Sequence, residues 1–84
     1  MRICFDMDGT ICTIRPDMDY ENAEPIWPMI ERIRAHKKAG DYVVIQTARG
    51  DGTGTDWHEV THRQLWDWSV PYDELRYDKA WADV

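Results

Sequence analysis

An apolar segment followed at once by two acidic residues constrains the fold of this chain more than any other feature. Residues 3–5 are apolar, and the sequence Asp6-Met7-Asp8-Gly9-Thr10 follows them directly. Side chains alternate along a strand, so carboxylates at i and i+2 share one face. Glycine then permits a sharp turn that brings backbone amides close to a ligand. Crowded carboxylates repel unless a cation or a shared proton separates them, so the pattern predicts a metal or acid/base site at a strand end.

Further signals follow this pattern in a fixed order along the chain. A segment rich in β-branched residues at 42–47 predicts a second strand, and its last residue is Thr47. Ala48 and Arg49 come next, and Lys79 follows a short predicted strand at 75–77. Each of these residues alone carries little information, and the feature to compare with known families is their order: a carboxylate pair, a hydroxyl and a lysine.

With these companions, the chain resembles the haloacid dehalogenase-like (HAD) superfamily. It is most similar to the small capless phosphatases of the polysaccharide-biosynthesis kind, and the resemblance covers nearly the whole chain. It extends over Tyr20-Glu21-Asn22, Thr47-Ala48-Arg49-Gly50 and Val70-Pro71-Tyr72-Asp73-Glu74-Leu75. The resemblance implies an Mg²⁺-dependent hydrolase of a phosphorylated substrate, either a small molecule or a larger one.

The resemblance also assigns roles to residues that match the family motifs. By position, Asp6 is the nucleophile and Asp8 the general acid/base, while Thr47 and Lys79 stabilise the transferring phosphoryl group. The predicted substrate-binding residues are Gly9, Thr10, Ala48 and Arg49, although a plain surface role for Arg49 is equally compatible with the sequence. The implied metal ligands are an Asp6 carboxylate oxygen and the Asp8 main-chain carbonyl, with Asp83 as a substitute ligand.

The family's fourth motif, an acidic pair on a further strand, has no counterpart after Lys79. We therefore expect weak phosphatase activity. The alternative is a phosphate- or metal-binding module, or an assembly module, that has lost turnover. In the family sheet the first strand lies between the second-motif and fourth-motif strands, so residues 3–5 are expected at an edge. Such an edge favours self-association, and we expect a homo-oligomer.

The predicted fold is α/β, a Rossmann-like HAD core with a parallel sheet of about three strands and flanking helices, truncated before the fourth-motif strand. Strands are expected at 2–6, 42–47 and 75–77. One helix is expected from Pro25 to just before Gly40, with a stripe of Ile26, Met29, Ile30 and Ile33, and a second over 57–68. The resemblance places a flap at 9–22, and the intervals between the motifs are too short for a cap domain.

A second motif competes with this interpretation. His58-Glu59-Val60-Thr61-His62 matches the HExxH signature of zinc peptidases, and both histidines fall on one face of the predicted helix. A zinc site needs a third ligand, for which Asp67 and Asp73 are candidates only by residue type. We favour histidines without a metal.

Composition bounds the remaining possibilities. The chain of 84 residues is expected to form a single domain, 1–84, whose small core is supported by five Trp, four Tyr and one Phe. A formal charge of −6 disfavours affinity for nucleic acid or an anionic membrane. No apolar segment is long enough to span a bilayer, and two cysteines do not make a disulfide framework. We therefore expect a reduced, cytoplasmic setting.

Overall fold

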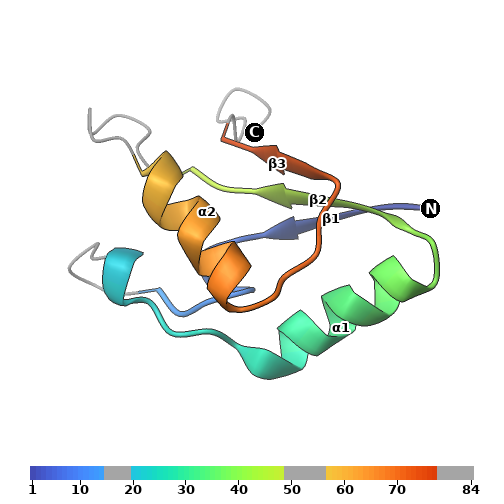
Figure 1. Ribbon diagram of the computed structural model, residues 1–84, viewed down its shortest axis with the longest axis horizontal. Helices are drawn as coiled ribbons and strands as arrows, with labels where there is room; N and C mark the ends of the chain where they lie inside the picture. The colour runs from blue at the N-terminus through green and yellow to red at the C-terminus, as the bar shows by residue number, and fades with distance from the viewer. Residues whose placement is uncertain (15–19, 49–56, 78–84) are drawn as a thin grey trace.

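The computed structural model describes residues 1–14, 20–48 and 57–77. Along the chain these residues form β1 (Arg2–Asp6), the 3-10 helix η1 (Tyr20–Asn22), α1 (Trp27–Lys38), β2 (Tyr42–Gln46), α2 (His58–Asp67) and β3 (Glu74–Arg76), as Figure 1 shows. This is the predicted β–α–β–α–β order. Within the described residues there is no cap domain and no helix long and apolar enough to cross a membrane.

The sheet has the strand order β1-β2-β3, and both neighbouring pairs are parallel. In its register Asp6 lies opposite Gln46, and Gln46 lies opposite Arg76. The carboxyl ends of the three strands therefore meet at one edge, where ligands bind in open α/β sheets. Among the described residues β1 is an edge strand, as the sequence predicted.

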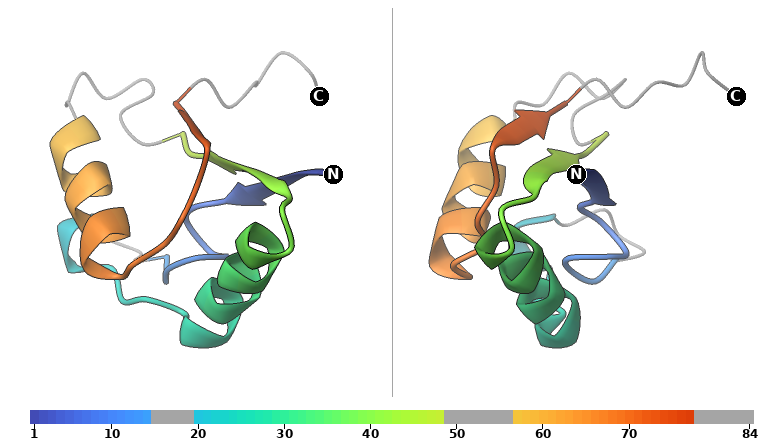
Figure 2. Two further views of the ribbon diagram at one scale, coloured as in Figure 1. Left: turned by 45° about the vertical axis from the view of Figure 1, so that its right-hand side comes forward. Right: turned by 90° about the vertical axis from the view of Figure 1, so that its right-hand side faces the viewer.

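Both helices cover the same face of the sheet, as the two views of Figure 2 show. The alternate β2 residues Val43 and Ile45 are fully buried against the helices. From α1 they meet Ile30 and Ile33, and from α2 they meet Leu65. This one-sided packing follows from the topology, because two successive crossovers that move in one direction along the sheet place their helices on one side.

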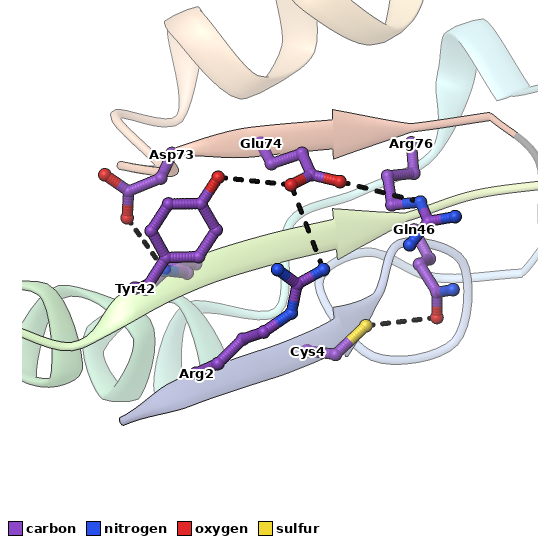
Figure 3. A network of polar contacts seen from close by, with 8 residues as sticks. Arg2, Cys4, Tyr42, Gln46, Asp73, Glu74 and Arg76 are labelled. Carbon is purple, nitrogen blue, oxygen red and sulfur yellow. Dashed lines mark hydrogen bonds and ion pairs between the residues drawn. The ribbon is translucent and has the colours of Figure 1, made fainter.

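The opposite face of the sheet carries a polar network, shown in Figure 3. Glu74 lies at its centre: one carboxylate oxygen accepts a 3.1 Å bond from the Tyr42 hydroxyl and lies 3.9 Å from the Arg2 guanidinium. The other oxygen lies 3.6 Å from Arg76 Nε. The bond to Glu74 raises the pKa of Tyr42. Nearer the strand ends, Cys4 Sγ donates to Gln46 Oε1 at 3.0 Å.

Helix α1 begins two residues later than predicted. Pro28, not Pro25, occupies the first helical turn, where a missing N–H costs nothing. Pro25 instead forms an antiparallel bridge with Cys12. The N–H of Ile26 donates to the Ile11 carbonyl at 2.8 Å and keeps this segment extended.

The other predicted features of the two helices hold. Helix α1 ends before Gly40, whose φ of +92° suits a residue without Cβ. Helix α2 lies within the predicted range 57–68, and its buried residues are Thr61, Gln64 and Leu65.

Polar contacts fix the turns that precede β3. After α2 the chain turns through Ser69, whose φ is +54°. Arg34 of α1 donates to the carbonyls of Trp68 at 2.8 Å and Ser69 at 3.1 Å, so this turn is held against α1. Asp73 accepts bonds from Lys37 Nζ at 2.6 Å and from the Val43 N–H at 2.8 Å. Strand β3 then starts at Glu74, one residue before the predicted segment.

The Asp73 contacts predict a dependence of stability on pH. The bond from Lys37, supported by that from the Val43 N–H, holds the pKa of Asp73 below its ordinary value. A carboxyl with a lowered folded-state pKa adds stability above its unfolded pKa and loses it as the pH falls through the folded value. We expect Asp73→Asn to lower the free energy of unfolding at pH 7, by a margin that narrows below about pH 4.

Urea unfolding of both proteins between about pH 7 and pH 2 measures this margin. Asp67→Asn, at the exposed end of α2, is the matched control and should change stability little at any pH. A margin for Asp73→Asn that stays constant with pH would contradict the assignment.

Candidate active site

The turn after β1 is organised around the backbone of Met7. Its N–H donates to the Gln46 carbonyl at 2.8 Å, which extends the β1–β2 pairing one residue beyond the strand. Its carbonyl accepts from the N–H groups of Thr10, Ile11 and Cys12 at 3.4, 2.9 and 3.2 Å. Gly9, with φ of +86°, allows the chain to reverse within this turn.

A cleft of about 230 Å³ opens beside this turn, at the carboxyl ends of β1 and β2. It brings together four residues that the sequence analysis selected, Asp6, Asp8, Thr47 and Ala48. Thr47 is only 2% exposed, and its N–H is fixed by the Arg76 carbonyl of β3 at 2.9 Å. Gly9 and Thr10, also predicted to bind substrate, form the adjoining turn and are not among the cleft-lining residues.

Two cysteines flank the acidic pair. Cys12 is fully buried, and its Sγ lies 3.5 Å from Asp8 Oδ1 and 3.6 Å from the Met7 carbonyl oxygen. The Cys12 thiol is therefore a hydrogen-bond donor to the Asp8 carboxylate. Cys4 lies on the sheet face that the helices leave uncovered. Partial desolvation of its thiol raises the pKa of Cys4, and the nearby Asp6 charge raises it further. A raised pKa keeps the thiol protonated and unreactive near neutral pH.

Three predicted site residues, Arg49, Lys79 and Asp83, lie outside the described residues. Their roles stay predictions.

The residues in the cleft fit a magnesium ion by their chemistry. Mg²⁺ favours oxygen ligands and is usually held by one or two carboxylates, with water and substrate phosphate completing the shell. Asp6 and Asp8 both line the cleft and supply two carboxylates. In the described part of the chain, no group of three or more His, Cys, Asp or Glu side chains is close enough to hold a metal alone.

The cleft also contains residues that sequence reasoning missed. Its lining also includes Ile14, Tyr20, Met7 and Gln46. Tyr20 is positioned by a contact distant in sequence, a 2.6 Å bond from Gln64 Nε2 to its carbonyl. Its ring meets Trp57 edge to face, with centroids 5.0 Å apart. The family resemblance included Tyr20-Glu21-Asn22 and placed a flap at 9–22, but it gave neither Ile14 nor Tyr20 a role in the site.

The two histidines of the HExxH pattern, His58 and His62, contact tyrosine side chains. The His58 ring stacks on Tyr77 with centroids 3.7 Å apart, and His62 Nδ1 lies 3.4 Å from the Tyr72 hydroxyl. No third ligand joins them among the residues the structure describes.

Comparison with known proteins shows the family by structure. No protein-family profile matches the chain, and no curated protein matches it. A crystal structure of an MCSG target from Vibrio cholerae matches with a TM-score of 0.83 and 30% identity, covering 95% of this chain and 71% of that one. The chain belongs to the same family as this Vibrio protein.

Two further matches are to chains of larger assemblies. One is in a structure of the Pnkp1/Rnl/Hen1 complex, with a TM-score of 0.71 and 22% identity over 95% of this chain and 29% of that chain. The other is in a structure of the Pnkp1/Rnl/Hen1 RNA repair complex, with a TM-score of 0.72 and 23% identity over 96% of this chain and 26% of that chain. At these identities the likeness shows a shared fold.

The turn that forms the cleft predicts the effect of a substitution at Gly9. A Cβ there would lie 2.9 Å from Ile14 Cδ1, and the φ of +86° strains any L-residue. Ile14 is 67% exposed and its chain end can move, so backbone strain should dominate. We expect Gly9→Ala to destabilise the fold by about 1–2 kcal/mol.

The same substitution in an Ile14→Ala background separates the two causes. Because strain dominates, the Gly9→Ala cost measured by urea unfolding should stay within about 0.5 kcal/mol of its value in the parent. Disappearance of the cost in that background would assign it to the side-chain contact instead.

Proposed function

We propose that this protein is a Mg²⁺-dependent phosphomonoester hydrolase of the HAD superfamily. The observation that carries the proposal is the convergence of Asp6, Asp8 and Thr47 in one cleft at the carboxyl ends of two parallel strands. Thr47 lies far from the acidic pair in sequence, and the three residues match the family motifs in order. Membership in the family of the Vibrio protein, with the same fold, is consistent with it.

Asp6 acts as the nucleophile in this proposal. One of its carboxylate oxygens attacks phosphorus, the bond from phosphorus to the leaving oxygen breaks, and an aspartyl phosphate forms. Asp6 suits this role because it ends β1, whose pairing with β2 fixes its backbone. A nucleophile on a rigid strand keeps the in-line geometry that the displacement needs.

Asp8 transfers the protons. It protonates the leaving oxygen in the first step, which releases the alcohol or phenol. In the second step it accepts a proton from water, whose oxygen attacks the aspartyl phosphate. The bond to Asp6 then breaks, inorganic phosphate leaves and both carboxyl groups return to their starting state. The contact from Cys12 restricts the Asp8 carboxylate to one side of the turn.

The remaining groups stabilise charge. The Thr47 hydroxyl donates to the phosphoryl oxygens. The N–H groups of residues 9–12 take no part, because they are bonded within the turn. Lys79 is proposed to neutralise the charges of Asp6 and phosphate. When bound by an Asp6 oxygen and the Asp8 main-chain carbonyl, Mg²⁺ would supply further charge neutralisation at the phosphoryl group.

Hydrolysis of an aryl phosphate with added Mg²⁺ tests the proposal. We expect measurable turnover that rises with Mg²⁺ into the tens of millimolar, roughly the weak end of protein sites for such cations. Asp6→Asn should lower kcat by at least about 10³-fold, since it removes the nucleophile. Thr47→Val should lower it by about 10²-fold, the usual effect of one lost donor.

Matched controls come from the same chain. Thr61→Val replaces another buried threonine, in α2, and Asp67→Asn replaces an exposed aspartate. Both should retain the parent rate. Absence of turnover at every Mg²⁺ concentration, or equal rates for the parent and Asp6→Asn, would overturn the enzyme assignment.

A phosphate- or metal-binding module without turnover is the second candidate. It is favoured by the lack of a three-ligand acidic cluster among the described residues. Binding of inorganic phosphate that is lost in Thr47→Val, without hydrolysis by the parent, would identify this function.

We also propose that the chain self-associates through β1. The Met1 carbonyl accepts from the Tyr42 N–H and the Met7 N–H donates to the Gln46 carbonyl, both toward β2. By alternation, the backbone groups of Arg2, Cys4 and Asp6 face the outer edge. An edge of this kind favours pairing with another strand. Light scattering at micromolar concentration should give about twice the chain mass of 10.0 kDa. A mass of one chain at all concentrations would contradict self-association.

A further inference from the structure

The lining of the candidate active site combines polar and apolar surface. Asp6, Asp8 and Thr47 line the cleft together with Ile14 and Tyr20, the two residues that we call its apolar wall. Ile14 is 67% exposed, which is unusual for a branched aliphatic side chain in a cleft with two carboxylates. The proposed phosphate chemistry gives neither residue a task. Ligand sites typically combine a few polar groups with apolar surface that holds the body of the ligand.

Both residues of this wall are held in place by their surroundings. Ile14 lies against Gly9, where the lack of a side chain leaves room for its Cδ1. Tyr20 belongs to η1, which is attached to α2 by the bond from the buried Gln64 to the Tyr20 carbonyl and by the 3.4 Å ion pair of Arg63 with Glu21. The contact with Trp57 orients its ring. A wall fixed before binding loses little entropy when a ligand arrives.

The volume of the cleft limits what this wall can contact. About 230 Å³ is below the roughly 300 Å³ at which pockets for drug-sized ligands begin. A phosphate group and one small ring are the scale of ligand that fits, and the rest of a larger substrate would lie outside. The group next to the phosphate is therefore the one that meets Ile14 and Tyr20.

We propose that Ile14 and Tyr20 bind the leaving group and select phosphomonoesters in which a planar aromatic ring is attached directly to the phosphate ester oxygen. Aromatic side chains pack well against flat rings, and an aliphatic neighbour adds apolar contact without a hydrogen-bonding requirement. A polyhydroxylated leaving group would lose water hydrogen bonds against the same wall without replacing them. This inference rests on the proposed function, because it takes the phosphate to lie beside Asp6 and Thr47.

Binding of phosphonates tests the wall separately from catalysis, because their phosphorus–carbon bond is not hydrolysed. Phenylphosphonate and methylphosphonate carry the same anionic group and differ in the ring. Titration calorimetry of the parent should give phenylphosphonate an affinity about five- to tenfold higher, the scale of one ring packed on an aromatic side chain. A nucleoside monophosphate, whose ring is separated from the phosphate by a sugar, should bind more weakly than phenylphosphonate.

Substitutions then locate the preference. Tyr20→Leu keeps apolar volume without a ring and should reduce the phenyl preference by about threefold or more, while methylphosphonate affinity is unchanged. Tyr20→Phe keeps the ring and should retain the preference. Ile14→Ala should reduce the preference for phenylphosphonate over methylphosphonate in part. Trp66→Ala, which removes an 84% exposed aromatic residue outside the cleft, is the control and should change neither affinity.

The outcomes separate this inference from the proposed function. A parent that hydrolyses aryl phosphate but binds the two phosphonates equally overturns the inference alone. So does a Tyr20→Leu variant that keeps the preference or loses both ligands equally, and so does tighter binding of the nucleoside monophosphate. A parent that binds neither phosphonate and hydrolyses nothing overturns the proposed function, and the inference with it.

Discussion

The parallel pairing of β1 with β2, continued by the bond from the Met7 N–H to the Gln46 carbonyl, is the interaction on which the candidate site depends. It sets Asp6 level with Gln46 and therefore beside Thr47. That bond fixes the backbone of Met7, whose carbonyl accepts hydrogen bonds from three N–H groups. These bonds define the turn that contains Asp8 and Gly9. A shift of the register by one residue would turn Asp6 to the opposite face of the sheet and dismantle the cleft.

The two faces of the sheet differ in polarity. One face carries Val43 and Ile45 into the core under both helices, and the other carries the network around Glu74. Val44 points toward the polar face and is nevertheless only 1% exposed, so the long side chains around it shield an apolar centre. A small domain of this kind gains burial on both sides of its central strand, although helices cover only one of them.

Most of the architecture could be predicted from the sequence because it depends on local patterns. Apolar periodicity located α1 and α2, and β-branched residues located β2. The order of the elements predicted a parallel sheet, and the family resemblance placed β1 at its edge. The errors are also instructive. Two prolines lie three residues apart, and propensity alone cannot show that Pro25 pairs with Cys12 while Pro28 enters the helix.

The site residues also divide into those set by local patterns, which are predictable, and those set by distant contacts, which are not. Asp6, Asp8, Thr47 and Ala48 converge because strand ends in a parallel sheet must converge, which makes them predictable. Tyr20 was missed because its position depends on Gln64, 44 residues away, and no periodicity reports such a contact. The HExxH pattern misleads in the opposite way: the spacing is correct for a shared helix face, but the neighbours of His58 and His62 are Tyr77 and Tyr72.

The attachment of η1 to α2 means that the two walls of the cleft belong to different parts of the fold. Asp6 ends β1 and Asp8 follows it in the turn, whereas Tyr20 is attached to α2 through Gln64. Arg34 of α1 holds the end of α2 through the carbonyls of Trp68 and Ser69. Arg34 does not line the cleft, yet it supports the helix on which the position of Tyr20 depends.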